Sequence, residues 1–358
     1  MGKEEDIKRI EEEIQKTKYN KATQYHIGQL KAKVSRLKEE AESGGKSGIG
    51  GKVFSIKKSG DATVLLVGFP SVGKSTLLNK ITSADSKVGE YDFTTLDVVP
   101  GVMKYNSSNI QVLDIPGIVT GASAGRGRGK KVLSVIRNAD LILIMIDSLH
   151  QLPIIERELY DSGFRLNEKV PNVVIRKTDR GGIKVSAGVR LRHVDEKMVK
   201  LIMNERGIHN ADVIIREDIT LDHLIDATSG NRAYVKALIV FSKSDLLTDE
   251  KKKTLHRDFI KISPLKGEGL EEMKKAIWNR LELIRIYMKR IGKPADMEKP
   301  LIMKRGANVY DTAEKIHREF ARNLDHARIW GPSSRFDGQK VGIKHVLRDC
   351  DVVELHMK

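Results

Sequence analysis

A glycine-rich turn between an apolar segment and a helical segment limits the folds open to this chain more than any other feature. The turn, Gly-Phe-Pro-Ser-Val-Gly-Lys-Ser over residues 68–75, matches G-x-x-x-x-G-K-[ST]. It follows the aliphatic run 62–67 and precedes a helical pattern at 76–81. Glycines let backbone N–H groups surround phosphate oxygens, and a helix N-terminus adds its positive dipole. The segment therefore predicts a phosphate-binding loop at the end of a buried parallel strand.

Each residue type in this turn suits a separate task in phosphate binding. Lys74 neutralises the β- and γ-phosphates, and Ser75 is placed to ligate Mg²⁺. The other positions contribute backbone around the phosphates. The predicted binding set is Gly68, Phe69, Pro70, Ser71, Val72, Gly73, Lys74, Ser75 and Thr76.

Two further motifs favour a nucleotide-dependent switch over other phosphate-loop proteins. Asp114-Ile115-Pro116-Gly117 follows the strand-like run 110–113, and Asp114 lies 40 residues after Lys74. We expect Asp114 to hold Mg²⁺ through water and the Gly117 N–H to contact the γ-phosphate. Between them, Phe93-Thr94-Thr95 supplies a threonine, Thr95, that completes the Mg²⁺ shell only with triphosphate bound. The predicted catalytic residues are Lys74, Thr95, Asp114 and Gly117, and the predicted metal ligands are Ser75 and Thr95.

Residues 242–245 predict guanine as the base. Ser242-Lys243-Ser244-Asp245 follows the apolar run 237–241 and resembles N-K-x-D, with serine in place of asparagine. Asp245 keeps the carboxylate that accepts from the guanine edge, and Lys243 keeps the stem that covers the ring. Ser263-Pro264-Leu265 occurs where a further guanine loop is expected. Proline has no N–H, so the Leu265 N–H is the expected donor, and affinity should be modest.

Apolar runs at 62–67, 141–146 and 237–241 alternate with helical patterns, which indicates a doubly wound α/β domain. A single crossover helix is far too short for the 90 residues that separate Asp147 from Ala237. We therefore expect a small inserted α+β subdomain at 165–232. Its predicted strands are 172–176, 183–186 and 212–216, and its predicted helix is 195–205.

The two ends of the chain form further modules. Residues 1–42 predict two polar helices joined by a turn at 19–21, either packed on the next domain or free to bind nucleic acid or a partner. Residues 271–288 predict one long helix that ends the α/β domain. The remainder predicts strands at 301–303 and 351–356 around a helix at 312–320. The expected domains are 1–60, 61–288 with the insertion, and 289–358.

Composition and charge limit the cellular location and the kinds of partner expected for this protein. The longest apolar run has six residues, 141–146, so no membrane helix is expected, and the charged start has no signal-peptide pattern. One cysteine, Cys350, allows no internal disulfide. A cytoplasmic protein is expected. The net charge is +16, and the stretches 1–60 and 288–358 each carry +5. The helical arm and the C-terminal module are therefore the expected polyanion contacts.

Together these residues resemble the developmentally regulated GTP-binding (Drg) family of the Obg group of GTPases. The likeness covers nearly the whole chain, in the stretches 20–37, 60–78, 91–101, 113–118, 125–130, 277–287 and 327–355. It implies an N-terminal helix–turn–helix, a P-loop NTPase G domain with an inserted subdomain like domain 2 of ribosomal protein S5, and a C-terminal TGS domain of β-grasp fold. It also implies GTP and GDP binding, Mg²⁺, and association with ribosomes, RNA and a dedicated partner protein. A monomer is expected.

Hydrolysis should proceed by in-line water attack on the γ-phosphate. Many GTPases place Gln after D-x-x-G to orient that water, whereas this chain has Ile118, so slow turnover is expected. Arg126 or Arg128 either stabilises charge as an internal finger or contacts rRNA, a partner or solvent. Ser71 lies where some relatives place a K⁺-ligating Asn. A serine hydroxyl offers one oxygen to such an ion, so stimulation of hydrolysis by K⁺ is an open alternative that no other residue supports.

Two other functions compete with a switching GTPase. One is a nucleotide-stabilised RNA- or protein-binding module with negligible hydrolysis. The other is an ATP-dependent enzyme such as a kinase, which Thr95 and Asp245 disfavour. A metal centre is disfavoured because the ten histidines show no H-x-x-x-H spacing, and His193, His209 and His223 suit surface or structural positions.

Overall fold

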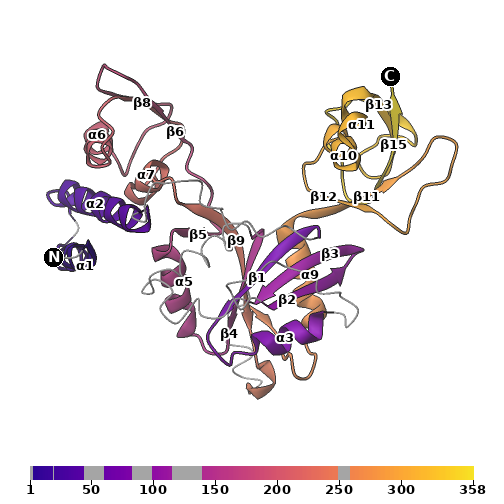
Figure 1. Cartoon of the computed structure of the whole chain (residues 1–358), viewed down its shortest axis with the longest axis horizontal. Helices are drawn as coiled ribbons and strands as arrows, with labels where there is room; N and C mark the ends of the chain where they lie inside the picture. The colour runs from indigo at the N-terminus through magenta and orange to yellow at the C-terminus, as the bar shows by residue number, and fades with distance from the viewer. Residues whose placement is uncertain (1–2, 19, 44–59, 83–98, 115–138, 249–258) are drawn as a thin grey trace. The chain divides into compact units, whose positions relative to one another are not determined.

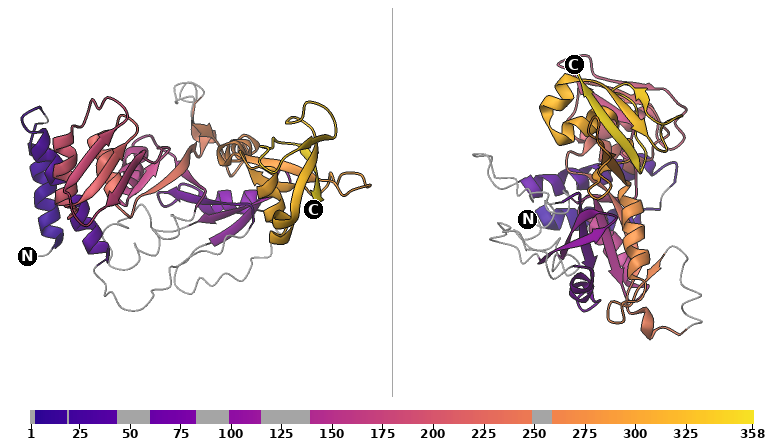
Figure 2. Two further views of the ribbon diagram at one scale, coloured as in Figure 1. Left: turned by 90° about the horizontal axis from the view of Figure 1, so that it is seen from above. Right: turned by 90° about the vertical axis from the view of Figure 1, so that its right-hand side faces the viewer.

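The computed structural model describes residues 3–18, 20–43, 60–82, 99–114, 139–248 and 259–358. The chain divides into two compact units. Unit 1 combines residues 1–52 with 163–234, and unit 2 combines 53–162 with 235–358. Each unit can be followed by residue colour in Figure 1 and from two further directions in Figure 2.

Unit 2 contains the predicted parallel sheet. Its strands are β1 (Ala62–Gly68), β2 (Val99–Tyr105), β3 (Ser108–Asp114), β4 (Leu141–Ile146), β9 (Ala233–Phe241) and β10 (Ile260–Lys261). They are ordered β10–β9–β4–β1–β3–β2, and β5 (Phe164–Leu166) pairs with β9 outside this order. Along the order, the strand pairings are parallel except that of β2 with β3, which is antiparallel. Every residue of β1 and β4 is buried. The continuous apolar runs therefore form central strands covered on both faces, as predicted.

Helices cover this sheet because each has one apolar stripe. Helix α3 (Lys74–Ile81) and helix α9 (Leu270–Leu281) place Leu77 and Ile277 in one core cluster with β1, β3 and β4. Helix α5 (Gln151–Asp161) buries Ile155 and Leu159 and contacts β4. The phosphate-loop sequence thus lies between a buried strand and a buried helix, in the context that the motif requires.

The predicted helix at 271–288 is wrong beyond residue 281. Helix α9 ends there, and Glu282 adopts a left-handed conformation with φ 54°. Residues 283–288 form strand β11 (Leu283–Met288), whose inward positions alternate instead of following a helical period. The run LELIRIYM satisfies both spacings, and pairing with neighbouring strands decides between them.

Strand β11 begins a second sheet in unit 2. The other strands are β12 (Leu301–Lys304), β13 (Leu324–Trp330), β14 (Gln339–Val341) and β15 (Asp351–Met357), in the order β12–β11–β15–β13–β14. Helices α10 (Val309–Ile316) and α11 (Arg318–Asn323) replace the single predicted helix. His317 lies between them with extended backbone, φ −164° and ψ 140°, and its side chain caps α11. This module has its own core around Ile286, Val309 and Val353.

Unit 1 joins the N-terminal helices to the insertion. Helices α1 (Lys3–Lys16) and α2 (Gln24–Ser43) precede β5 (Phe164–Leu166), β6 (Val173–Lys177), β7 (Ile183–Ala187), α6 (Glu196–Glu205), β8 (Ala211–Ile215) and α7 (Leu221–Thr228). The sheet order is β6–β8–β7, with β6 antiparallel and β7 parallel to β8. The insertion is therefore a small α+β subdomain, as predicted.

Helix α2 packs on this insertion, and α1 packs on α2. Helix α2 contacts α6 and α7, and fully buried Ala32 belongs to the core of the insertion. Ion pairs join the same surfaces, including Lys31 Nζ with Asp222 Oδ1 at 2.8 Å and Arg206 Nη2 with Glu39 Oε2 at 2.5 Å. Of the two possibilities left open by the sequence, the structure shows a packed hairpin.

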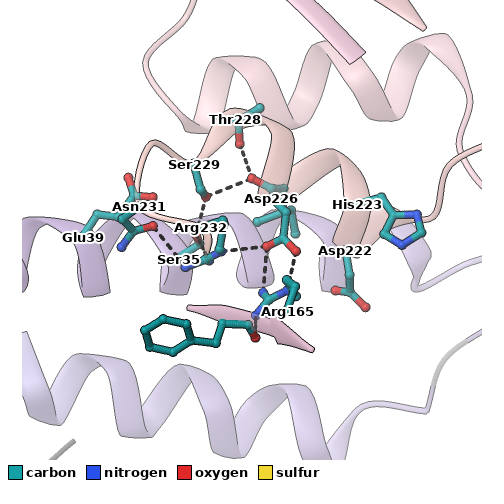
Figure 3. A network of polar contacts seen from close by, with 12 residues as sticks. Ser35, Glu39, Arg165, Asp222, His223, Asp226, Thr228, Ser229, Asn231 and Arg232 are labelled. Carbon is teal, nitrogen blue, oxygen red and sulfur yellow. Dashed lines mark hydrogen bonds and ion pairs between the residues drawn. The ribbon is translucent and has the colours of Figure 1, made fainter. Parts of the chain in front are cut away.

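A buried polar network lies within unit 1 (Figure 3). The Arg165 guanidinium donates to both Asp226 oxygens, with Nε–Oδ2 at 2.5 Å and Nη2–Oδ1 at 2.8 Å. Arg232 Nε donates to the same Oδ1 at 2.7 Å, and Arg232 Nη2 donates to Ser35 Oγ on α2 at 3.0 Å. One carboxylate thereby links two arginines at the ends of the insertion to the N-terminal arm.

Candidate functional site

The lysine of the phosphate loop is hydrogen-bonded to the backbone of the same loop. Lys74 Nζ donates to the carbonyl oxygens of Gly68 at 2.9 Å and Phe69 at 3.0 Å. Gly73, the N-cap of α3, has φ +102°, a conformation that L side chains rarely adopt. Burial lowers the pKa of Lys74, and the charge of Asp114 opposes that shift only in part. An anionic ligand in the loop would therefore stabilise the charged form of Lys74.

Ser75 and Asp114 meet where strands β1 and β3 end. Strand pairing sets Leu66 opposite Asp114, and Ser75 Oγ donates to Asp114 Oδ2 at 3.2 Å. Asp114 is only 6% exposed, and its Oδ1 accepts no hydrogen bond from any described residue. A buried, unsatisfied carboxylate oxygen is costly, whereas hard oxygen donors suit Mg²⁺. This donor pair therefore fits the ion predicted from the sequence.

Ser242 faces the phosphate loop instead of the solvent. Its N–H donates to Ile146 O at 2.7 Å, which fixes the end of β9 beside β4. The side chain is fully buried, and Oγ has no hydrogen-bond partner within the described residues. A Cβ built on Gly73 would lie 3.3 Å from this Oγ. The position where serine replaces the expected asparagine therefore lies beside Gly73 of the loop.

Lys243 is positioned by residues that lie outside the sequence motifs. Its backbone is left-handed, with φ 55°, and Nζ lies 2.7 Å from Asp147 Oδ2 at the end of β4. Gln151 Nε2 donates to Asp147 Oδ1 at 2.7 Å, and the Asp147 N–H donates to Gln151 Oε1 at 3.0 Å. Burial alone would raise the pKa of Asp147, but hydrogen bonds from Lys243 and Gln151 outweigh it and the pKa is lowered. The sequence signal for Asp147 was its position directly after a buried strand, where a carboxylate lies at the edge of the sheet that binds ligands.

The second predicted guanine loop lies beside the first. The Ser244 N–H donates to Ile262 O at 3.0 Å, and the Lys266 N–H donates to Ser263 Oγ at 3.3 Å. Pro264 is buried and Leu265 is 75% exposed. Asp245 lies within the short helix η1 (Ser244–Leu246) and is half-buried. Residues 242–245 and 263–265 are thus brought together, although 18 residues separate them.

A pocket of about 400 Å³ opens next to these loops. It is lined by Ser244, Lys261 and residues 267–272. Of the site residues predicted within the described chain, it includes Ser244 alone. Its place beside η1 does not coincide with the phosphate loop, and we assign it no ligand.

Several predicted residues lie outside the described part of the chain. They are Phe93, Thr94, Thr95, Ile115, Pro116, Gly117, Ile118, Arg126 and Arg128. Their assignments stay predictions from the sequence.

Other site types find little support in the described residues. No group of three or more His, Cys, Asp or Glu side chains there is arranged to hold a metal ion. His223 completes a capping box with Thr220 at the start of α7, which is a structural role. None of the described helices combines the length and apolar character that crossing a bilayer requires.

Three consecutive segments match known families in sequence. Residues 63–177 match the family described as 50S ribosome-binding GTPase, and residues 180–283 match the C-terminal region of that same domain. Residues 284–357 match the TGS domain. Fold and site together therefore define a P-loop G domain, interrupted by an insertion and followed by a TGS domain.

Full-length relatives place the chain within a family. A GTP-binding protein of Methanocaldococcus jannaschii is 52% identical over 367 aligned positions, covering 100% of this chain and 94% of the relative. Developmentally-regulated GTP-binding protein 2 of Homo sapiens is 40% identical over 364 positions, covering 100% of both. A crystal structure of a GTP binding protein from Pyrococcus horikoshii OT3 aligns with TM-score 0.45 at 15% identity, covering 83% of this chain and 100% of that one. This chain belongs to the developmentally regulated GTP-binding protein family and is a GTP-binding protein.

Proposed function

We propose that this protein is a Mg²⁺-dependent GTPase with slow intrinsic turnover that acts as a ribosome- or RNA-associated switch in translation. One observation carries the proposal. Ser75 and Asp114 meet where β1 and β3 end, and Ser242, directly before Lys243, lies beside Gly73 of the phosphate loop, 169 residues earlier in the chain. Ligands of open α/β sheets bind at this edge, outside the carboxyl ends of the strands.

The described residues have distinct proposed tasks. Backbone N–H groups within residues 68–76, except at Pro70, surround the phosphates, and Lys74 exchanges its two carbonyl contacts for phosphate oxygens. Ser75 and Asp114 would hold Mg²⁺, the aspartate through water, and the ion would neutralise charge on the β- and γ-phosphates. Thr95 and Gly117 complete the triphosphate-dependent contacts. Together these groups would stabilise the negative charge that develops when water attacks the γ-phosphate in line.

Guanine recognition is assigned to the two neighbouring loops. Asp245 accepts from the guanine N1–H and N2–H₂ groups, and the Lys243 stem covers the ring. Ser242, Ser244, Ser263, Pro264 and Leu265 complete the proposed pocket. The Asp147–Lys243 ion pair supports this role because it fixes the lysine stem in place before nucleotide binds.

Single-turnover GTP cleavage tests the enzymatic half of the proposal. We expect the wild-type protein to release phosphate when Mg²⁺ is present. The Ser75→Ala variant should lose this Mg²⁺-dependent release. Thr248→Ala is a matched control because Thr248 is an exposed hydroxyl residue of unit 2. No cleavage, even with ribosomes present, would favour the alternative of a nucleotide-stabilised RNA- or protein-binding module. Tighter binding of ATP than of GTP would contradict the base assignment.

Cosedimentation with ribosomes tests the other half. The matched family description, 50S ribosome-binding GTPase, and the net charge of +16 support a ribosomal or RNA partner. We expect more protein in the ribosomal pellet with a non-hydrolysable GTP analogue than with GDP. Equal pelleting in both nucleotide states would remove the switch from the proposal.

The remaining sequence predictions are part of the same proposal. They are a cytoplasmic monomer, a dedicated partner protein, and a division into an arm at 1–60, a G domain at 61–288 with its insertion at 165–232, and a TGS domain at 289–358. K⁺ stimulation through Ser71 stays a prediction, and equal hydrolysis rates in K⁺ and Na⁺ would contradict it.

A further inference from the structure

Many cations on and between the helices of unit 1 are paired with carboxylates, as in Lys31–Asp222, Arg36–Glu205, Lys38–Glu11, Lys200–Glu196 and Arg206–Glu39. Six exposed cations on the sheet and its connecting loops form no ion pair with any described residue. They are Arg176, Lys177, Arg180, Lys184, Arg190 and Arg216.

Three of these cations share the face of the sheet that points away from α6 and α7. Val173, Val185 and Val213 turn inward to the core with those helices, so alternate residues turn outward. Register places Arg176 and Lys184 on either side of Asp212. Arg216 continues the outward row of β8, because its N–H donates to Asn172 O at 3.0 Å. We call Arg176, Lys184 and Arg216 the sheet-face cations.

The dimensions of this face follow from strand geometry. Two strand spacings separate Arg176 from Lys184, which is about 10 Å. Arg216 lies level with Asn172, four residues before Arg176, so the face extends about 13 Å along the strands. Arg180 lies in the loop at one end and Arg190 in the loop at the other. Asp212 is the only carboxylate among the outward residues of the three described strands.

The composition of the face favours nucleic acid over protein. Its centre holds Val174, Ile214 and Ser186 in register, and none of the three strands contains an aromatic residue. Protein interfaces are enriched in aromatic anchors, whereas unpaired arginine forks suit phosphate oxygens. Without aromatic side chains the face offers no ring on which bases could stack, so the arginines and the lysine would contact mainly the sugar–phosphate backbone.

We propose that the outward face of the β6–β8–β7 sheet binds the phosphate backbone of structured RNA with little sequence preference, which rests on the RNA association proposed above. The helical arm is then a support for this subdomain and not the main RNA contact. The carboxylate of Asp212 limits the affinity, because it lies between Arg176 and Lys184 and repels phosphate.

Binding of the full-length protein to a labelled RNA duplex of about 16 base pairs tests the assignment. The first variant combines Arg176→Ala, Lys184→Ala and Arg216→Ala. Its matched control removes the same charge from exposed lysines of the arm, with Lys8→Ala, Lys18→Ala and Lys33→Ala. We expect the sheet-face variant to bind at least 10-fold more weakly. Each lost phosphate contact should reduce the slope of log K against log salt by about one.

Two single variants guard against a folding artefact. Asp212→Asn should tighten RNA binding several-fold, a gain that a damaged protein would not show. Ser186→Glu adds a charge at an exposed position in the centre of the face and should weaken binding. Circular dichroism establishes that each variant is folded.

The outcomes separate this inference from the proposed function. Equal or greater loss in the arm control, or wild-type RNA affinity in the sheet-face variant, would overturn the inference and leave the face to another partner such as an acidic protein. Wild-type protein that neither binds the duplex nor cosediments with ribosomes would instead overturn the proposed association itself.

Discussion

The ammonium of Lys243 lies 2.7 Å from Asp147 Oδ2, and the same carboxylate is held from its other side by Gln151. This chain of contacts joins the end of β4 to the loop after β9, two strands that lie side by side in the sheet. A flexible lysine in the predicted base pocket is thus fixed in direction before nucleotide arrives. Less conformational entropy is then lost on binding.

Asp147→Asn should weaken GDP and GTP binding because Lys243 loses its charged partner. The pair is partly exposed, so we expect about 1 kcal/mol, or about fivefold in Kd. Asp161→Asn, which removes the partner of Arg157 at the end of α5, is the matched control. Isothermal calorimetry measures both. The effect should largely vanish in a Lys243→Ala background, and an undiminished effect there would contradict positioning through Lys243.

The same ion pair makes a prediction about pH. The folded protein lowers the pKa of Asp147, so its contribution to stability is present above the ordinary carboxyl pKa and is lost as pH falls through the lowered value. The difference in unfolding free energy between wild type and Asp147→Asn should therefore be largest near neutral pH and shrink in acid. Urea unfolding across pH measures it. A difference that grows toward acid would have the wrong sign.

Gly73→Ala should weaken nucleotide binding strongly while leaving the protein folded. The new Cβ would require a left-handed alanine at φ +102° and would lie 3.3 Å from Ser242 Oγ. Gly292→Ala, at φ +73° with no atom within 4 Å, measures the backbone cost alone. We expect more than 10-fold weaker GDP binding for Gly73→Ala only. Adding Ser242→Gly should restore part of the affinity, and failure to do so would assign the whole effect to backbone strain.

Binding of GTP at alkaline pH should take up protons. Burial lowers the pKa of Lys74 in the nucleotide-free protein, and phosphate oxygens beside Nζ would raise it again. Calorimetry near pH ~9.5 in two buffers of different ionisation enthalpy measures the uptake. The Lys74→Met variant is the control for any residual binding. Proton release on binding would contradict this account of the loop.

Asp226→Asn should destabilise unit 1 strongly because it leaves two arginines facing a neutral group. Asp226 and Arg165 are each only 3% exposed, so a loss of about 3 kcal/mol is expected. Asp222→Asn, on the same helix α7, breaks the half-exposed pair with Lys31 and should cost under about 1 kcal/mol. Both tryptophans, Trp278 and Trp330, lie in unit 2, so hydrogen exchange is the appropriate measurement. Equal protection in the two variants would contradict the estimate.

Much of the G domain could be predicted because its signals are local. The strands β1 and β4 are unbroken aliphatic runs, and the phosphate loop combines glycines, Lys74 and Ser75 within eight residues. The meeting of Ser75 with Asp114 also followed from the sequence, since parallel strands deliver their carboxyl ends to one edge. In these segments the residue types alone determine both conformation and chemistry.

Tertiary contacts decided what local patterns left ambiguous. Residues 283–288 fit a helix by spacing, and pairing with β12 and β15 makes them a strand. The arm could have been free, and burial of Ala32 against the insertion fixes it in place. Asp147 became part of the site only because the fold brings it to Lys243, 96 residues later. The sequence by itself determined those strands, helices and loops whose residues form one strong local pattern. The pairings between distant segments depend on contacts that form only when the whole chain is folded.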